Sequence, residues 1–150
     1  MEGKANMRTH MRTIPEARAD LAALRRHEQV SCRKSLALLR CNPHAGRPLR
    51  DGSGMRKLYV VPGQDPGSLI GRRPVRDANG FSDATQRIVF EAFSAPRTGE
   101  VLLVVWAVGL AHPQPGEPSV YELASRRRAA MIPTTTTRKD IRRTSRRTSG

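Results

Sequence analysis

The sequence predicts one domain that contains both helices and strands (α/β in the broad sense, α+β in the strict one). A helical hairpin precedes the sheet in the chain. Two segments with apolar residues at helical spacing lie between residues 14 and 41, and β-like runs follow from residue 56 onward. A chain of 150 residues has room for one ordinary domain. We therefore expect helices first, a sheet after them, and a single core between the two.

The first predicted helix starts at Pro15, because proline fits the first turn of a helix and Glu16 complements the helix dipole. A single apolar stripe is formed by Ile14, Ala17, Leu21 and Leu24. This spacing predicts a helix of about three turns. Residues 11–14 ahead of it could form a short edge strand.

The second predicted helix follows a polar break at residues 26–28. Its apolar stripe consists of Cys32, Leu36 and Leu39, and it should end before Asn42, because a residue that precedes proline avoids the α region. The two helices should run antiparallel. Cys32 and Cys41 both fall in this helix and lack metal-ligand spacing, so we interpret them as small buried hydrophobes in a reducing compartment.

Strand patterns dominate the rest of the chain. Residues 42–54 hold three glycines and two prolines, which predicts a connector into the sheet. Four β-like runs are residues 56–61, 86–91, 101–108 and 120–123. The run 101–108 is apolar throughout, which predicts a central strand buried on both faces. A short helix over residues 124–130 should follow the last run.

The sequence predicts three segments outside the folded core: an N-terminal segment, an inserted loop and a C-terminal tail. We expect a flexible N-terminus over residues 1–10, a folded domain over 11–130 and a disordered basic tail over 131–150, since the tail has no apolar period. Residues 62–85 are rich in Gly and Pro and too long for a hairpin turn, which predicts an inserted, mobile, basic loop.

Basic and hydroxyl-bearing side chains share one face of the predicted sheet. Strand side chains alternate between faces, so Lys57 and Tyr59 lie on one side of their strand, and Arg87 lies on one side of the next. Such a face suits a phosphate backbone. The formal net charge of +14 makes nucleic acid, a ribosome or an acidic protein the natural partner class. Aromatic residues make up only 4%, which argues against an extensive base-stacking surface.

Five sequence blocks, in order, resemble those of the RelE/ParE toxin superfamily. The blocks are Asn-Pro-x-x-Gly-x-Pro-Leu at 42–49, Met-Arg-Lys-Leu at 55–58, Arg-Ile-Val-Phe-Glu at 87–91, Val-Trp-Ala-Val-Gly at 105–109 and Val-Tyr-Glu-Leu-Ala at 120–124. The resemblance covers about residues 11–128. It implies two helices on a small, twisted, mostly antiparallel sheet, and a cognate antitoxin of a type II toxin-antitoxin system as partner.

The RelE branch of this superfamily cleaves messenger RNA on the ribosome. The resemblance implies that Arg87 contacts phosphate, that Lys57 neutralises phosphate or takes a proton, and that Tyr121 stacks on a base or assists proton transfer. Further nucleic-acid contacts are predicted at Arg56, Tyr59, Arg72, Arg73, Arg126 and Arg127.

The sequence also departs from the nuclease pattern. Residues 110–116 hold no basic residue except His112, where the family's nuclease branch has an arginine, and Tyr59 replaces a second lysine. Two alternatives therefore stay open. One is a ParE-like inhibitor of DNA gyrase without nuclease activity, and the other is an inactive family member that binds nucleic acid through charge alone.

Some classes of function are not indicated. The four histidines are scattered, no carboxylate cluster offers metal ligands, and the glycines between 63 and 71 lack a following Gly-Lys-Ser/Thr. We expect no metal and no cofactor. No apolar run reaches the length that spans a bilayer, so we expect a cytoplasmic protein without membrane contact.

Overall fold

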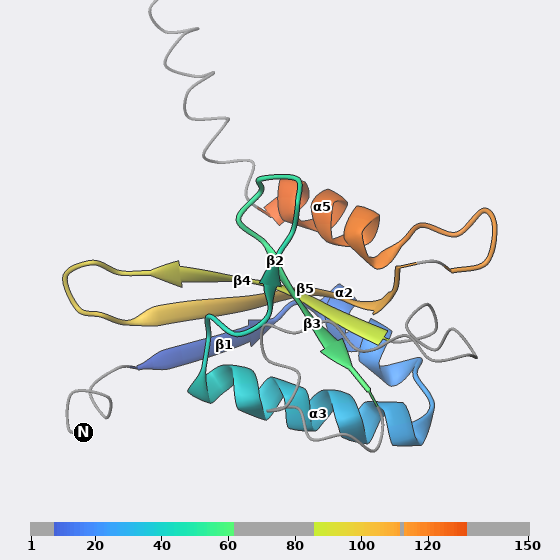
Figure 1. Cartoon of the computed structure of the whole chain (residues 1–150), viewed down its shortest axis with the longest axis horizontal. Coiled ribbons are helices and arrows are strands. Elements are labelled where there is room, and N and C mark those ends of the chain that lie inside the picture. The colour runs from blue at the N-terminus through green and yellow to red at the C-terminus, as the bar shows by residue number, and fades with distance from the viewer. Residues whose placement is uncertain (1–7, 62–85, 112, 132–150) are drawn as a thin grey trace, which may run out of the picture.

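The computed structural model describes residues 8–61, 86–111 and 113–131, which form helices on both faces of one sheet (Figure 1). The elements in chain order are β1 (Thr9–Thr13), α2 (Pro15–Ala22), α3 (Arg26–Cys41), β2 (Arg47–Pro48), β3 (Arg56–Val60), β4 (Gln86–Ser94), β5 (Val101–Leu110) and α5 (Val120–Met131). The predicted loop at 62–85, His112 and nearly all of the predicted tail lie outside the described residues, as do residues 1–7.

The sheet is mixed and its strand order is β1-β5-β4-β3-β2. Strand β1 runs parallel to β5, and the other neighbouring strands are antiparallel. The predicted central position of residues 101–108 is wrong, since β4 occupies the middle and β5 lies beside it. The run is apolar because β5 is nevertheless an interior strand that contacts both α2 and α5.

The two N-terminal helices differ from their predicted bounds at the break between them. Helix α2 ends at Ala22, two residues before the last residue of the apolar stripe, Leu24. The residues predicted as a polar break instead form the first turn of α3, where the Glu28 carboxylate accepts a hydrogen bond from the Arg25 backbone N–H at 3.2 Å. Helix α3 ends at Cys41, directly before Asn42-Pro43 as predicted.

The helices pack on the sheet more than on each other. Helix α2 contacts mainly β5, whereas α3 contacts β3 and β1. Figure 1 shows α3 below the sheet and α5 above it. The predicted antiparallel hairpin of α2 and α3 stays a prediction. The edge strand predicted at residues 11–14 is present as β1, two residues earlier.

The predicted strand at residues 120–123 is wrong, because these residues form the first turn of α5. The Ser119 hydroxyl accepts from the Glu122 backbone N–H at 3.2 Å, and the Glu122 carboxylate accepts from the Ser119 N–H at 2.9 Å. This reciprocal pair is a capping box, which starts a helix. The Ser-x-x-Glu signal was present in the sequence and outweighs the strand-like composition of Val-Tyr.

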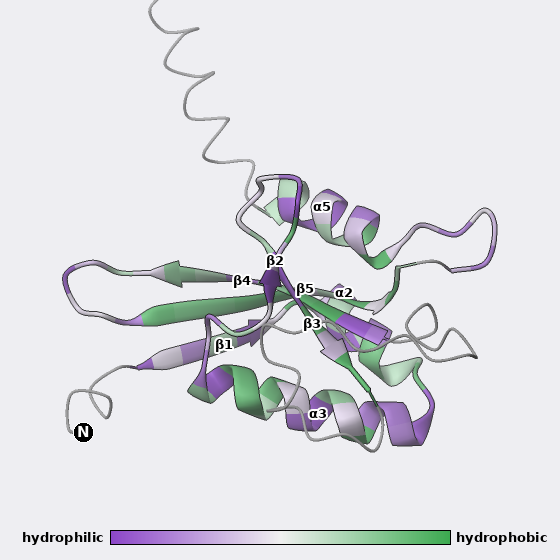
Figure 2. Ribbon diagram, viewed as in Figure 1, coloured by the Kyte–Doolittle hydropathy of each residue, from purple (hydrophilic) through white to green (hydrophobic). Residues whose placement is uncertain are grey.

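The core lies between the sheet and its helices, and Figure 2 shows hydrophobic residues along β4 and β5. The largest fully buried side chains include Trp106, Phe90, Ile14 and Leu39. Among the described residues, no helix has the length and apolarity needed to cross a membrane.

The two cysteines of α3 should differ in reactivity. Cys32 is buried and Cys41 is exposed. Burial, aided by the nearby Glu28 charge, raises the pKa of the Cys32 thiol to about 12, so the reactive thiolate does not form at neutral pH. We expect iodoacetamide to modify Cys41 in the native protein and Cys32 only in urea, as measured by mass spectrometry. Equal native rates for both thiols would contradict the packing of α3.

Candidate functional site

The register of β3 and β4 brings the predicted basic face together. Tyr59 pairs with Arg87 and Lys57 pairs with Val89 across the two antiparallel strands. Directly paired side chains project from the same face of a sheet. Lys57, Tyr59 and Arg87 therefore lie together on the face that α5 covers, where Tyr121 joins them.

Rings and cations alternate in this group. The Tyr121 ring centroid lies 5.3 Å from the Lys57 Nζ, which in turn lies 5.6 Å from the Tyr59 ring centroid. The Arg87 Cζ lies 5.0 Å from the same Tyr59 ring. A cation within about 6 Å of a ring centroid is attracted by the ring quadrupole. We call Tyr121, Lys57, Tyr59 and Arg87 the tyrosine-cation stack.

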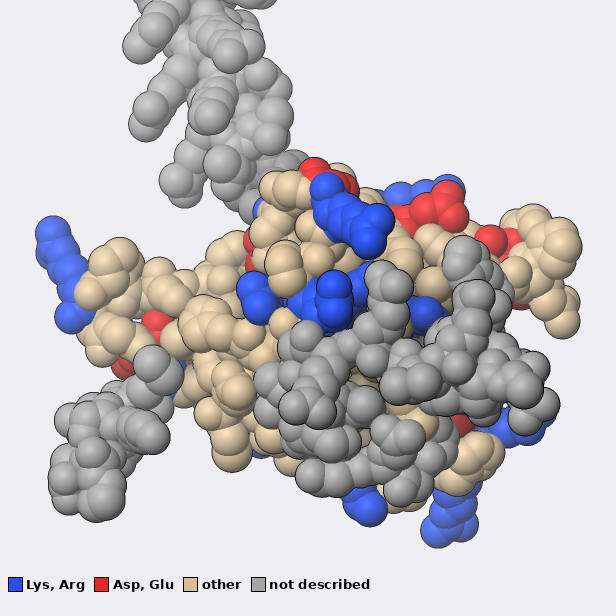
Figure 3. All heavy atoms as spheres, in the orientation of Figure 1, with Lys and Arg blue, Asp and Glu red and all other residues tan. Residues whose placement is uncertain are grey.

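The stack has a buried end and an accessible end. Arg87 and Tyr59 are only 6% and 5% exposed, whereas Lys57 and Tyr121 are half-buried. Lys and Arg side chains gather beneath α5 on the face shown in Figure 3. Solvent therefore reaches Lys57 and Tyr121 more readily than it reaches Arg87 and Tyr59. Lys57 is the more exposed of the two cations, and direct phosphate contact by either one stays a prediction.

Close approach of α5 to the sheet sets the position of Tyr121. A Cβ placed on Gly109 would lie 3.5 Å from the Val120 Cβ, an ordinary van der Waals contact, so the first turn of α5 packs directly against β5. Gly109 is also the register partner of Arg87. Val120 is buried at this contact, and its neighbour Tyr121 lies with its ring next to Lys57.

The backbone of Gly46 lies close to the backbone of Lys57 and helps to fix its position. Gly46 has φ +88°, and a Cβ built on it would lie 2.4 Å from the Lys57 carbonyl oxygen. Arg56 closes the same turn by donating from Nε to the Ala45 carbonyl at 3.3 Å and from Nη2 to the Gly46 carbonyl at 3.0 Å. The connector thus fixes the backbone of Lys57.

The other predicted nucleic-acid contacts do not join the stack. Arg56 alternates with Lys57 along β3 and is engaged with the connector, and Arg127 forms an ion pair with Asp20. Arg126 is exposed on α5. Arg72 and Arg73 lie outside the described residues. A nucleic-acid role for these arginines stays a prediction.

Three charged residues that the sequence patterns did not single out hold α5 in place. They are Asp20 on α2, Glu91 on β4 and Arg128 on α5. The hydrogen bond to Glu91 raises the pKa of the Arg128 guanidinium, so this group stays fully charged. A carboxylate between the apolar residues of strand β4 was the signal available in the sequence, because buried carboxylates are almost always paired.

The chain matches no family model and no curated protein. A solved structure of the Escherichia coli toxin RelE, a mutant in the free state with two arginines replaced by alanine, is similar in fold. The TM-score is 0.50 at 16% sequence identity, over 81% of this chain and 98% of that one. The fold is RelE-like. In the part of this chain that the structure describes, the fold consists of three helices and a mixed five-stranded sheet.

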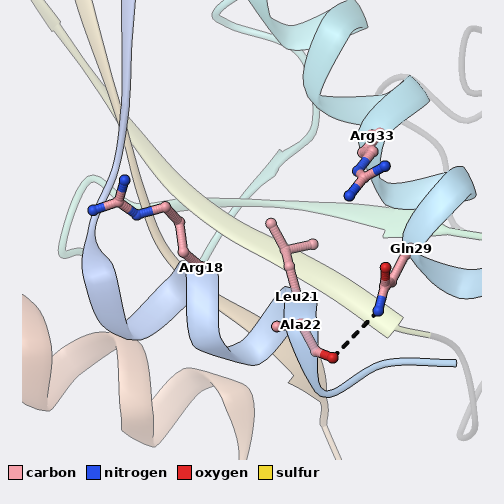
Figure 4. Close-up of a pocket in the computed structure, with 5 residues that line it drawn as sticks. All are labelled: Arg18, Leu21, Ala22, Gln29 and Arg33. Atoms are coloured by element: carbon pink, nitrogen blue, oxygen red, sulfur yellow. Dashed lines mark hydrogen bonds between the residues drawn. The ribbon is translucent and has the colours of Figure 1, made fainter. Parts of the chain in front are cut away.

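One other surface feature lies apart from the stack. Arg18, Leu21 and Ala22 of α2 line an open pocket together with Gln29 and Arg33 of α3 (Figure 4). The Gln29 side-chain amide donates to the Ala22 carbonyl at 3.2 Å and to the Leu24 carbonyl at 2.9 Å. These bonds connect α3 to the last residue of α2 and to the short segment that joins the two helices.

Proposed function

We propose that this protein is the toxin of a type II toxin-antitoxin system and cleaves ribosome-bound messenger RNA without a metal ion. The tyrosine-cation stack is the observation that carries the proposal, because it concentrates two cations and two phenols on one face of a RelE-like fold. The positive net charge of +14 supports a polyanionic target.

The proposed reaction is an attack by a ribose 2′-oxygen on the neighbouring phosphorus. The 2′-hydroxyl loses its proton, the new P–O bond forms, and the bond from phosphorus to the 5′-oxygen breaks. The products are a 2′,3′-cyclic phosphate and a 5′-hydroxyl that has gained a proton. Catalysis requires proton transfer at both oxygens and stabilisation of the extra charge on phosphate.

The residues of the stack suit different parts of this reaction. Lys57 is the accessible cation and would bind the phosphate oxygens, holding their charge as it increases. Tyr121 lies beside it and would stack on a base or pass a proton through its hydroxyl. Arg87 adds a second positive charge from the buried end, in an environment where charge is poorly screened.

The proposed partners follow from this function. A cognate antitoxin would hold the toxin inactive, and the ribosome would present the messenger RNA. Both partners are in the cytoplasm, where we propose that the protein acts. None of the proposed steps needs a cofactor.

One observation favours a second candidate. In the described part of the segment between β5 and α5, residue 111 and residues 113–119, there is no Lys or Arg. The site therefore has fewer cations than the nuclease pattern calls for. A ParE-like gyrase inhibitor, or an inactive family member that binds nucleic acid through charge, needs no phosphate catalyst and would tolerate this loss.

Induced expression in a bacterial host tests the proposal. We expect growth arrest and new 5′ ends in cellular messenger RNA, mapped by primer extension, for the native chain and neither for Lys57→Met. Lys57→Met is the preferred inactive variant because Arg87 is buried and its replacement would also disturb packing.

The remaining outcomes separate the alternatives. Arrest with a DNA-damage response and without new RNA ends would contradict the nuclease and support gyrase inhibition. No arrest, with binding to RNA that weakens steeply as salt rises, would support the inactive binding protein.

A further inference from the structure

Helix α5 has little apolar surface to hold it on the sheet. Only Val120 and Ala124 of its residues are buried, and both side chains are small. Tyr121 and Leu123 are packed against the core but only partly buried. The apolar contacts are also confined to the first turns of the helix. Its second half must be held in another way.

Asp20 of α2 holds that second half from one side. Its Oδ2 accepts from Arg127 Nη1 at 2.6 Å and its Oδ1 accepts from Arg127 Nη2 at 3.2 Å. The same Oδ2 accepts from the Val108 backbone N–H at 3.0 Å, and Arg127 also donates to the Trp106 carbonyl at 3.1 Å. These bonds occupy the edge of β5 beyond the point where its pairing with β1 ends.

Glu91 of β4 holds the next residue of the helix. Its Oε1 accepts from Arg128 Nε at 2.7 Å, and its Oε2 accepts from Arg128 Nη2 at 3.1 Å. The Trp106 indole N–H donates to the same Oε1 at 3.2 Å. The Glu91 side chain is 8% exposed, so this carboxylate is almost entirely removed from water.

Consecutive arginines therefore bind carboxylates on two different elements. Bidentate arginine-carboxylate pairs fix orientation as well as distance, and removing one partner of a buried pair leaves an uncompensated charge. With Arg127 bound to α2 and Arg128 bound to β4, the helix can neither roll about its axis nor lift from the sheet without breaking a pair. Tyr121 is about 9 Å along the helix axis from Arg127.

We propose that Asp20 and Glu91 are positioning residues of the site, which hold α5 through Arg127 and Arg128 so that the Tyr121 ring stays over Lys57. Their own hydrogen bonds go to Arg127, Arg128, the Val108 backbone and Trp106. The geometric part of this proposal stands on the structure alone, and its catalytic consequence rests on the proposed function.

The ε-methylene protons of Lys57 report the geometry directly. Because Lys57 Nζ lies near two rings, we expect its signal in the purified full chain labelled with ¹³C-lysine to be shifted upfield from those of the other lysines. Tyr121→Leu should remove the part of the shift that comes from this ring. We expect Asp20→Asn and Glu91→Gln to remove the same part, while Arg40→Ala, which replaces an exposed arginine of α3, leaves the signal unchanged.

A preserved Lys57 shift in both carboxylate variants would overturn the proposal. A carboxylate variant that loses its dispersed amide spectrum has unfolded and cannot test the proposal. In that case Arg127→Lys and Arg128→Lys are measured instead, since lysine keeps the positive charge but cannot form the bidentate pair. In those variants an intermediate shift is expected, and a native shift would count against the proposal.

Cleavage assays separate this proposal from the proposed function. We expect kcat to fall about 100-fold in Asp20→Asn and Glu91→Gln, because a displacement of about 1 Å at a catalytic group has that effect. Adding Tyr121→Phe to either variant should cost nothing further, since the phenol is already misplaced. Additive losses would contradict positioning through Tyr121. A native chain that does not cleave would refute the nuclease and leave the Lys57 measurement to decide the geometry.

Discussion

Replacing Lys57 with methionine is expected to lower the rate of RNA cleavage by about 100- to 1,000-fold, the usual cost of removing one group that stabilises transition-state charge. Lys57 is the accessible cation of the stack, between the rings of Tyr59 and Tyr121. Methionine keeps the length and flexibility of the side chain and removes its charge. The loss should therefore appear in single-turnover cleavage of messenger RNA on purified ribosomes, without a large change in thermal stability.

Matched variants define what the Lys57 result means. Lys57→Arg keeps the charge and should retain most of the phosphate binding, although the larger planar group fits the space between the rings differently. Arg40→Ala removes an exposed positive charge from α3, outside the stack, and should cleave like the native protein. A native cleavage rate in Lys57→Met would show that the stack is a structural feature only.

Replacing Gly46 with alanine is expected to lower the free energy of unfolding by about 2–4 kcal/mol, which places it among the severe single substitutions. The residue has φ +88°, where an L side chain is strained, and its new Cβ would lie 2.4 Å from the Lys57 carbonyl oxygen. That oxygen belongs to the backbone of β3, so the clash cannot be relieved by rotating a side chain. Urea unfolding followed by Trp106 fluorescence measures the loss.

Gly52→Ala provides the matched control for this prediction. Gly52 also has a positive φ, +74°, but nothing lies within 4 Å of a Cβ placed there. Its replacement should therefore cost only the conformational term, about 1–2 kcal/mol. If both variants lose the same stability, the close approach between Gly46 and Lys57 is not a significant constraint. A selective loss in Gly46→Ala should also displace Lys57 and lower cleavage.

Local patterns were sufficient where neighbouring residues decide the structure. Pro15 begins α2, and Asn42-Pro43 ends α3 at Cys41, because proline acts on the backbone next to it. The shared face of Lys57 and Tyr59 follows from strand alternation. In contrast, Val120 to Leu123 were predicted as a strand from composition, and the capping box of Ser119 and Glu122 makes them a helix.

Part of the candidate site could be predicted from the sequence, and part of it only from the folded structure. The side-chain types of the stack were visible in the sequence, and so was the resemblance that pointed to Arg87, Lys57 and Tyr121. Their exposure was not visible in the sequence, since only the packed structure shows that Arg87 and Tyr59 are buried while Lys57 and Tyr121 are half-buried. The carboxylates that hold α5 were also missed, because Asp20 and Arg127 are 107 residues apart and no local pattern links them.

The sequence by itself determined the two N-terminal helices, the strands β3, β4 and β5, the apolar runs that form the core and the basic character of the chain. These features depend on composition and short-range periodicity. Only the tertiary structure decided that β4 is the central strand, that β1 pairs in parallel with β5 and that four side chains from β3, β4 and α5 form one stack. Register and helix placement depend on contacts between distant segments, whose energies are set by the fit of whole surfaces.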